Sequence, residues 1–287
     1  MNAIYRKELK SIFCGMTGVI FAAYVLVWFG IYTVALNLSG GYSQFEYTIA
    51  SVAFISLLAI PVITMRSFSE EKHSKTDSLL YSLPMKTVSV VVAKYLAMIT
   101  VFAVPIIIAL IYPLILSSYG TVYLNTSLST MLAYFLLGAS LIAICMFISS
   151  LTESQVIAAI LSLGSIILIY YLSAISSLFS SSASSSLTVL LIICVLIGFL
   201  TYRMTENPIV AVIVTAVLAA ACLIVYGVNS SLFENLFPNI LSSLDLFSKT
   251  NKFINGIFDL KAVIFFISTV VFFNFLTVQS VEKKRWN

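Results

Sequence analysis

Long apolar runs separated by short polar segments repeat along the chain. They lie at 17–38, 47–65, 95–117, 128–150, 154–173, 186–202, 208–227 and 262–281. About 20 apolar residues form a helix that crosses the hydrocarbon core of a membrane, where lipid offers no partner to unpaired backbone groups. The pattern predicts eight membrane-spanning helices. The sixth run is short and borrows from the serine-rich stretch 180–186; if it does not cross, the seventh also changes status and six spans follow.

Composition agrees with this pattern. Hydrophobic residues make up 61% of the chain and charged residues only 9%, which is typical of an integral membrane protein. We therefore expect an all-α, polytopic helical bundle surrounded by membrane lipids. The net charge of +4 is explained by lysine and arginine retained in cytoplasmic loops and by anionic lipid headgroups, so no nucleic-acid partner is expected.

The basic residues also predict the orientation. Twelve of the fifteen fall on one side of the eight-span arrangement, and placing that side in the cytoplasm puts both termini inside. The twelve are Arg6, Lys7, Lys10, Arg66, Lys72, Lys75, Lys86, Lys94, Arg203, Lys283, Lys284 and Arg285, and the other three are Lys249, Lys252 and Lys261.

Several kinds of chemistry have no residues to support them. The chain has no GxxxxGK[ST] phosphate-binding loop, and no ionisable side chain lies well inside a predicted span. The only histidine is His73 and the four cysteines form no CxxC pair, so we expect no metal site, no bound cofactor and no enzyme activity. An ion-coupled secondary transporter stays open, because backbone carbonyls can bind sodium.

A charged segment at 66–94 joins the second and third runs and forms the largest predicted cytoplasmic loop. It carries the apolar residues Phe68, Leu79, Leu80 and Leu83 among charged ones, and a short helix is predicted from about Lys75 to Leu83, ended by Pro84. Such a helix suits docking into a soluble partner. A solvated loop with its helix on the lipid headgroups is an equally open interpretation.

The residues of this segment resemble the loop after the second span of ABC-2-type transporter permeases. The matching order is Arg66-Ser-Phe-Ser-Glu-Glu-Lys72, then Thr76-Asp-Ser-Leu-Leu-Tyr-Ser-Leu-Pro84, then Lys94 at the third span; Lys75 stands where the family usually has glycine. The resemblance implies a coupling helix that rests on a separate ATP-binding subunit, with ATP and Mg bound there. The residues it assigns to coupling are Arg66, Phe68, Glu70, Glu71, Lys75, Thr76, Asp77, Leu79, Leu80, Leu83 and Pro84.

The segment before the last span resembles the gliding-motility-type branch of these permeases. There the resemblance implies an external exit region, carried here by Phe247, Phe253, Gly256 and Asp259. That branch often has six spans, so the pair near 186–227 looks like an added helical hairpin. Apolar residues at helical spacing from Phe233 to Phe247 also predict a helix on the outer leaflet within the external region 228–260. A structural lid, or a segment that rests on the membrane surface, is the other interpretation of this region.

The N-terminal residues 1–16 predict an amphipathic interfacial helix. Tyr5 and Leu9 fall on one side, with Arg6, Lys7 and Lys10 mostly on another. The resemblance implies a connecting helix that also contacts the ATP-binding subunit; a simple membrane anchor is the other interpretation.

Together these features predict one permease domain over 1–287 in a bacterial cytoplasmic membrane. It is expected to be the subunit of an ABC exporter that pairs with a second permease chain, in a homodimer or a related heterodimer. Its apolar spans suit amphipathic or lipid-like cargo. A secondary transporter and a non-transporting scaffold or sensor remain the alternatives.

Overall fold

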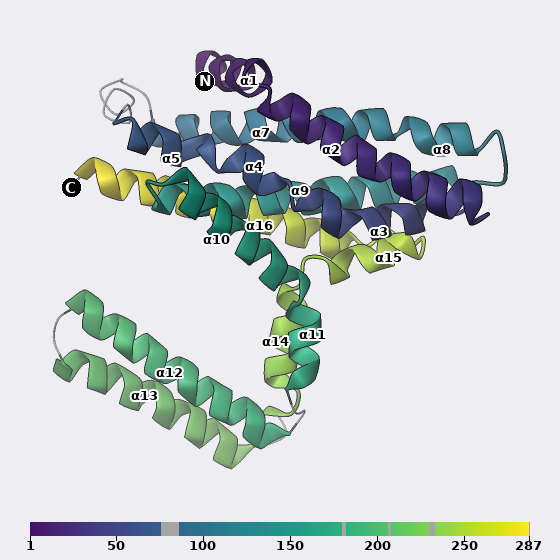
Figure 1. The fold of residues 1–287 in the computed structure, drawn as a ribbon. Coiled ribbons are helices and arrows are strands. Elements are labelled where there is room, and N and C mark those ends of the chain that lie inside the picture. Colours follow the sequence, from purple (N-terminus) through teal and green to yellow (C-terminus); the bar gives the residue numbers. More distant parts are fainter. Residues whose placement is uncertain (76–85, 180–181, 206–207, 230–232, 287) are drawn as a thin grey trace. The chain divides into compact units, whose positions relative to one another are not determined.

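The computed structural model describes residues 1–75, 86–179, 182–205, 208–229 and 233–286. Within these ranges the chain is helical and has no strand (Figure 1). The contacts cluster in two compact units, residues 1–168 with 249–287, and residues 169–248. The helices are α1 (Asn2–Cys14), α2 (Thr17–Tyr32), the π-helix η1 (Thr33–Ser39), α3 (Phe45–Leu57), α4 (Ile60–Thr64), α5 (Arg66–His73), α7 (Thr87–Ala109), α8 (Ile111–Leu116), α9 (Leu124–Leu151), α10 (Gln155–Tyr170), α11 (Leu172–Leu178), α12 (Ala183–Thr205), α13 (Pro208–Val228), α14 (Leu236–Leu244), the 3₁₀ turn η3 (Ser248–Thr250), α15 (Asn251–Ile254) and α16 (Leu260–Trp286).

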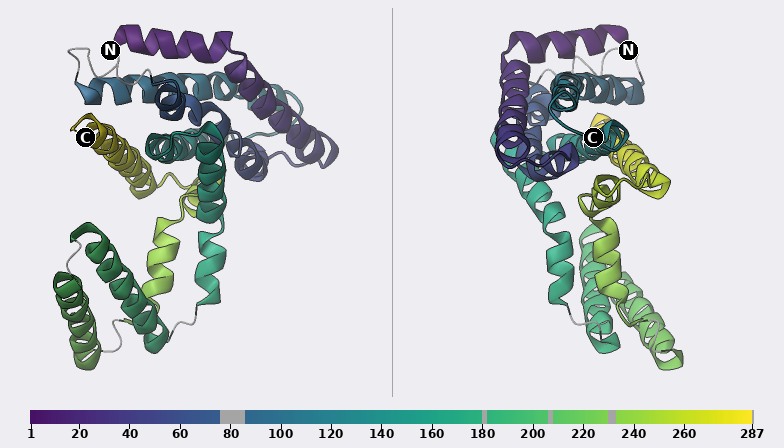
Figure 2. Two further views of the ribbon diagram at one scale, coloured as in Figure 1. Left: turned by 60° about the vertical axis from the view of Figure 1, so that its left-hand side comes forward. Right: turned by 90° about the vertical axis from the view of Figure 1, so that its right-hand side faces the viewer.

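Helix α9 is the centre of the first unit. Most of it is buried, and it packs against α3, α4, α5, α7, α15 and α16. Small residues on α9 let its neighbours approach closely: a Cβ atom added to Gly138 would lie 2.2 Å from the Cζ atom of Phe102. A buried hydrogen bond of 2.7 Å joins the hydroxyls of Tyr134 on α9 and Ser56 on α3. Figure 2 shows α1 at the edge of this unit, alongside α7.

All eight predicted spans coincide with helices. Four helical stretches are long and apolar enough to cross a membrane: Thr17–Ser39, Thr87–Leu116, Leu124–Leu151 and Leu260–Lys283. Two bent pairs raise the number to six, namely Phe45–Leu57 with Ile60–His73, bent by 44°, and Gln155–Tyr170 with Leu172–Leu178, bent by 56°. The first bend comes just before Pro61, as expected where proline removes a backbone donor. The count of eight and the orientation of the termini stay predictions.

The boundaries around the charged segment differ from the sequence prediction. Residues Arg66–His73 form helix α5 and do not belong to a loop, and α7 begins at Thr87, eight residues before the predicted 95. The prediction of a loop over 66–94 is therefore wrong at both ends. The physical reason is that Lys72 and Lys94 are buried and bonded within the bundle, so their charges do not force the backbone out into water.

The second unit contains α11 to α14. Helix α11 packs against α14, and α12 against α13 and α14. The rings of Phe179 and Phe237 meet edge to face at 4.8 Å, and the Ser173 hydroxyl donates to Asp245. The helix predicted on the apolar spacing from Phe233 to Phe247 is confirmed as α14. Its place on the outer leaflet, and the single domain over 1–287, stay predictions.

Candidate functional site

A buried lysine joins three helices at the end of the first unit where α1 lies. Lys94 on α7 has an exposed fraction of 1%. Its Nζ donates to Oε1 of Glu8 on α1 at 2.9 Å, to Oε1 of Glu71 on α5 at 2.9 Å, and to the carbonyl oxygen of Ser67 at 2.8 Å. An ammonium group has three N–H donors, so all three are satisfied. We call Glu8, Glu71 and Lys94 the lysine joint.

The surroundings of the joint balance its charge. Lys7 of α1 lies 3.8 Å from Oε1 of Glu71, which gives two ammonium groups and two carboxylates. The ring of Phe68 is 5.2 Å from the Lys94 Nζ, within the range of a cation–π contact. A buried charge is tolerated when it is paired and hydrogen-bonded, and removing one partner costs about 3–5 kcal/mol. Separating α1 or α5 from α7 would break this pairing.

Helix α5 is also attached to the end of α9. The Ser149 hydroxyl accepts hydrogen bonds from the backbone N–H groups of Phe68 and Ser69, both at 3.3 Å, and donates to the Met65 carbonyl at 3.1 Å. The Lys72 Nζ donates to the carbonyl oxygen of Ser150. These bonds fix α5 to the central helix, so a displacement of α5 acts directly on α9.

The structure divides the predicted coupling residues from Arg66 to Lys75 into two sets. Phe68 is 4% exposed and Glu71 belongs to the lysine joint, so both face the bundle. The Phe68 ring is buried in the bundle beside the Lys94 Nζ, so the structure does not offer Phe68 as the apolar anchor for a partner that the sequence predicted. Arg66, Glu70 and Lys75 are exposed. Thr76, Asp77, Leu79, Leu80, Leu83 and Pro84 lie outside the described residues.

Lys75 adopts a backbone conformation that favours glycine. Its φ is +54°, in the left-handed region. This residue stands where the resembled permeases usually have glycine. The local backbone therefore gives a physical reason for glycine at this position, and a lysine here carries a small conformational cost.

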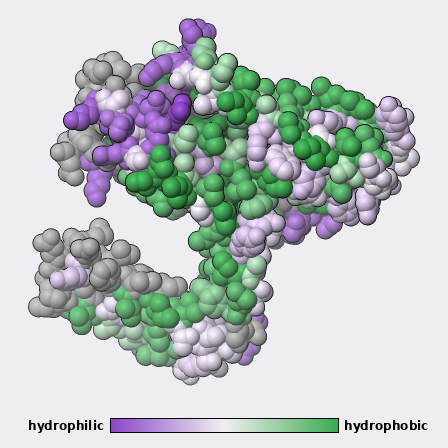
Figure 3. All heavy atoms as spheres, viewed as in Figure 1, coloured by the Kyte–Doolittle hydropathy of each residue, from purple (hydrophilic) through white to green (hydrophobic). Residues whose placement is uncertain are grey.

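Helix α1 confirms the amphipathic pattern of the N-terminus. Ile4 is buried against Val90 and Ala93 of α7, and the Tyr5 hydroxyl is hydrogen-bonded to the Thr100 hydroxyl at 2.9 Å. Leu9 is half-buried, whereas Arg6, Lys7 and Lys10 are exposed. Figure 3 shows hydrophilic residues gathered where α1 and α5 lie. This charged surface is distinct from the apolar surface of the helices beyond it.

Sequence reasoning missed Glu8 and the pairing of Lys94. The available signal was a single charge in the apolar run from Val88 to Leu96, since a lysine within a span needs a partner. Glu8 is the only acidic residue of the amphipathic N-terminal segment. The partners of Lys94 depend on how α1, α5 and α7 pack together. A single sequence does not show this packing.

A comparison with family models identifies the chain. The model of ABC-2 family transporter proteins matches residues 4–205, more than half of the sequence. The chain belongs to the ABC-2 transporter family. No curated protein and no solved structure matched it. The match runs from within α1 to the end of α12, and all three residues of the lysine joint lie in the matched part of this ABC-2-type permease.

Three of the four residues predicted for the exit region lie at the other end of the permease's first unit, around α15 (Figure 1). Phe253 is fully buried, and its carbonyl oxygen accepts a hydrogen bond from Thr130 at 3.0 Å. Gly256 has a φ of +78°. Asp259 pairs with Lys252 at 2.7 Å, and this hydrogen bond holds the pKa of its carboxyl below the ordinary value of 3.8. These three residues belong to a folded segment that runs from α15 to the start of α16.

Phe247, the fourth predicted exit residue, lies in the second unit. Its ring meets that of Tyr170 edge to face at 5.0 Å, and its backbone N–H donates to Oδ1 of Asp245 at 2.8 Å. The other three belong to the first unit. Its contacts are those of a residue that stabilises the turn after α14.

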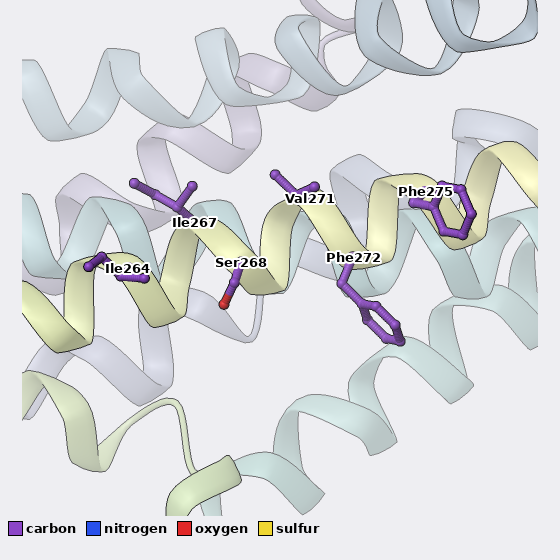
Figure 4. A pocket seen from close by; sticks show the side chains of 6 residues that line it. All are labelled: Ile264, Ile267, Ser268, Val271, Phe272 and Phe275. Atoms are coloured by element: carbon purple, nitrogen blue, oxygen red, sulfur yellow. The ribbon is translucent and has the colours of Figure 1, made fainter.

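The permease also presents an apolar surface along α16. The residues that line its shallow hollow all come from this helix (Figure 4): Ile264, Ile267, Ser268, Val271, Phe272 and Phe275. Five of the six are apolar and at least half exposed, so lipid or another apolar helix can cover them. Among the described residues no three His, Cys, Asp or Glu side chains are grouped to hold a metal ion.

Proposed function

We propose that the chain is the transmembrane permease subunit of an ATP-driven exporter in a bacterial cytoplasmic membrane. In this proposal a separate P-loop ATPase binds ATP and Mg and rests on the outward residues of α1 and α5. A second permease chain, identical or related, completes the path. Membership of the ABC-2 family supports the class.

The observation that carries the proposal is the lysine joint. Lys94 bonds α1 and α5 at a single atom and belongs to α7, whose apolar stretch Thr87–Leu116 is long enough to span a membrane. A force applied to the outward side of either short helix therefore reaches a span without passing through a flexible connection. This is what a subunit driven by another protein requires.

Exposed charged side chains on α1 and α5 support a docking surface for the partner there. Arg6, Lys7 and Lys10 of α1 and Arg66 and Glu70 of α5 are exposed. Charged groups on such a surface favour electrostatic steering and correct docking of a partner with complementary charge. Glu70 is the best residue to test, because Glu71 also belongs to the lysine joint and its replacement would disturb folding as well as docking.

The proposal is tested by reconstituting the chain with a candidate P-loop ATPase, sought first in the reading frames next to its own. We expect no ATP hydrolysis by the chain alone and hydrolysis linked to transport in the complex. Glu70→Lys should reduce transport per ATP hydrolysed by about tenfold, because one reversed contact at a docking surface costs about 1–2 kcal/mol. Glu153→Lys is the matched control, since Glu153 is also exposed and follows the end of α9 that holds α5.

Two results would contradict the proposal. Transport by the lone chain down an ion gradient would identify a secondary transporter. A complex that forms but whose ATPase never responds to any transported compound would identify a scaffold or sensor. If Glu70→Lys leaves the ratio of transport to hydrolysis unchanged, the chain is still an ABC permease, but α5 does not belong to the docking surface.

A further inference from the structure

A polar cavity lies at the end of the first unit opposite the lysine joint. Its volume is about 420 Å³, and its lining includes Gln44, Glu46, Tyr47, Tyr123, Asn255 and Gly256. This volume is within the range of small-molecule sites, about 300–1,000 Å³. The cavity is formed by the start of α3, the segment before α9 and the turn after α15. The positive φ of Gly256 shapes that turn.

Glu46 is the chemically distinctive part of the wall. Its exposed fraction is 3%, and the Ser127 hydroxyl donates to its Oε1 at 2.8 Å. Among the described residues no lysine, arginine or histidine forms an ion pair with it. The nearby Lys252 pairs with Asp259. Glu46 stands in the first turn of α3, where the helix dipole favours a negative charge by about 0.3–1 kcal/mol. That is less than the cost of burying a carboxylate. A cation bound in the cavity would therefore stabilise the Glu46 carboxylate.

The other lining residues indicate which cation suits the cavity. A divalent metal ion takes six or more oxygen ligands and prefers several carboxylates, and the described part of the chain groups no such set. An organic ammonium needs one carboxylate, hydrogen-bond acceptors and an apolar or aromatic wall. Glu46 supplies the first, the amides of Gln44 and Asn255 the second, and Tyr47 and Tyr123 the third.

We propose that this cavity is a binding site for a primary ammonium group, held by the Glu46 carboxylate. The group belongs either to a soluble amine or to the headgroup of a phosphatidylethanolamine lipid. The proposal goes beyond the transport function and does not depend on it. It concerns residues outside the lysine joint and requires neither a partner subunit nor ATP.

The test uses the purified full chain in phosphatidylcholine nanodiscs, with ethylammonium as the probe and ethanol as its neutral counterpart. We expect ethylammonium to bind and ethanol not to bind, measured by saturation-transfer NMR. Glu46→Gln should weaken ethylammonium binding by about tenfold or more, which corresponds to one charge-assisted hydrogen bond. Glu46→Asp, which keeps the charge, should bind more tightly than Glu46→Gln. Glu234→Gln, which removes an exposed carboxylate elsewhere, should bind as the wild type does.

A second arm replaces phosphatidylcholine with phosphatidylethanolamine. If the lipid headgroup occupies the cavity, ethylammonium binding falls in these nanodiscs; if a soluble amine is the ligand, it does not. Equal binding of ethylammonium and ethanol by the wild type, or equal ethylammonium binding by wild type and Glu46→Gln, would overturn the proposal. The ethanol comparison needs no variant and stays decisive if the Glu46 variants do not fold.

Discussion

At the scale of single residues, the lysine joint places one positive charge between two negative ones in a site with little water. Lys94 is 1% exposed, and the side chains of Glu8 and Glu71 are 14% and 16% exposed. The energetic importance of such a group lies mainly in what remains when it is removed. Without the ammonium, two carboxylates stay close together in a poorly solvated position and repel each other.

We therefore expect Lys94→Met to lower the thermal unfolding midpoint of the purified chain by about 5–15 °C, which corresponds to about 3–5 kcal/mol. Adding Glu8→Gln and Glu71→Gln to Lys94→Met should recover part of the loss, because no unpaired charge is then buried. Lys86→Met is the control, since Lys86 is exposed just before α7. Its replacement should change the free energy of unfolding by less than about 0.5 kcal/mol. Equal midpoints for Lys94→Met and Lys86→Met would show that the joint contributes nothing to stability.

At the scale of helices, the packing of α9 requires that α7 comes close to it at Gly138. Gly138 faces Phe102, whose ring stacks on Phe135 at 5.9 Å and lies 5.9 Å from Tyr134. A Cβ atom at position 138 would meet Cζ and Cε1 of Phe102 at 2.2 and 2.3 Å. Because the ring is held by its neighbours, it has little room to give way.

Gly138→Ala is expected to destabilise the chain by about 1–3 kcal/mol, the usual cost of overpacking a core. Gly164→Ala is the matched control: the same change within α10, where no atom lies within 4 Å of the new Cβ, should be neutral or slightly stabilising because alanine is the better helix former. Both variants are measured by the midpoint of thermal unfolding in detergent. A Gly138→Ala protein as stable as Gly164→Ala would mean that α7 and α9 can separate at no cost.

The sequence predicted the elements better than their ends. The apolar runs located every span as a helix, because in lipid a backbone without internal hydrogen bonds is too costly. The start of α7 at Thr87 escaped prediction, since Lys94 looks like the polar end of a loop when its partners are unknown. The outward face of α5 was partly recognised through Glu70. The inward role of Phe68 was not, because an apolar residue in a charged segment suits a partner and a core equally well.

At the scale of the whole molecule, α12 and α13 decide how many helices span the membrane. At 1.5 Å per residue, their 23 and 21 residues span about 30–35 Å, enough for the hydrocarbon core. Because the two helices follow each other directly, both cross or neither does, and the two termini lie on the same side in either case. The connection between them discriminates, since it faces the cytoplasm only if both cross.

We expect eight spans, and therefore a cysteine at position 207, between the two helices, that is protected from a membrane-impermeant thiol reagent added outside intact cells. Arg203 supports a cytoplasmic position for this connection, because basic residues of short loops stay on the cytoplasmic side. The variant Asn207→Cys is made in a chain whose four native cysteines are replaced by serine or alanine. Tyr119→Cys, in the loop before α9, should be labelled from outside, and Lys86→Cys only after the membrane is opened. Labelling of Asn207→Cys from outside, with both controls behaving as stated, would mean that the hairpin rests on the outer side and that six helices span the membrane.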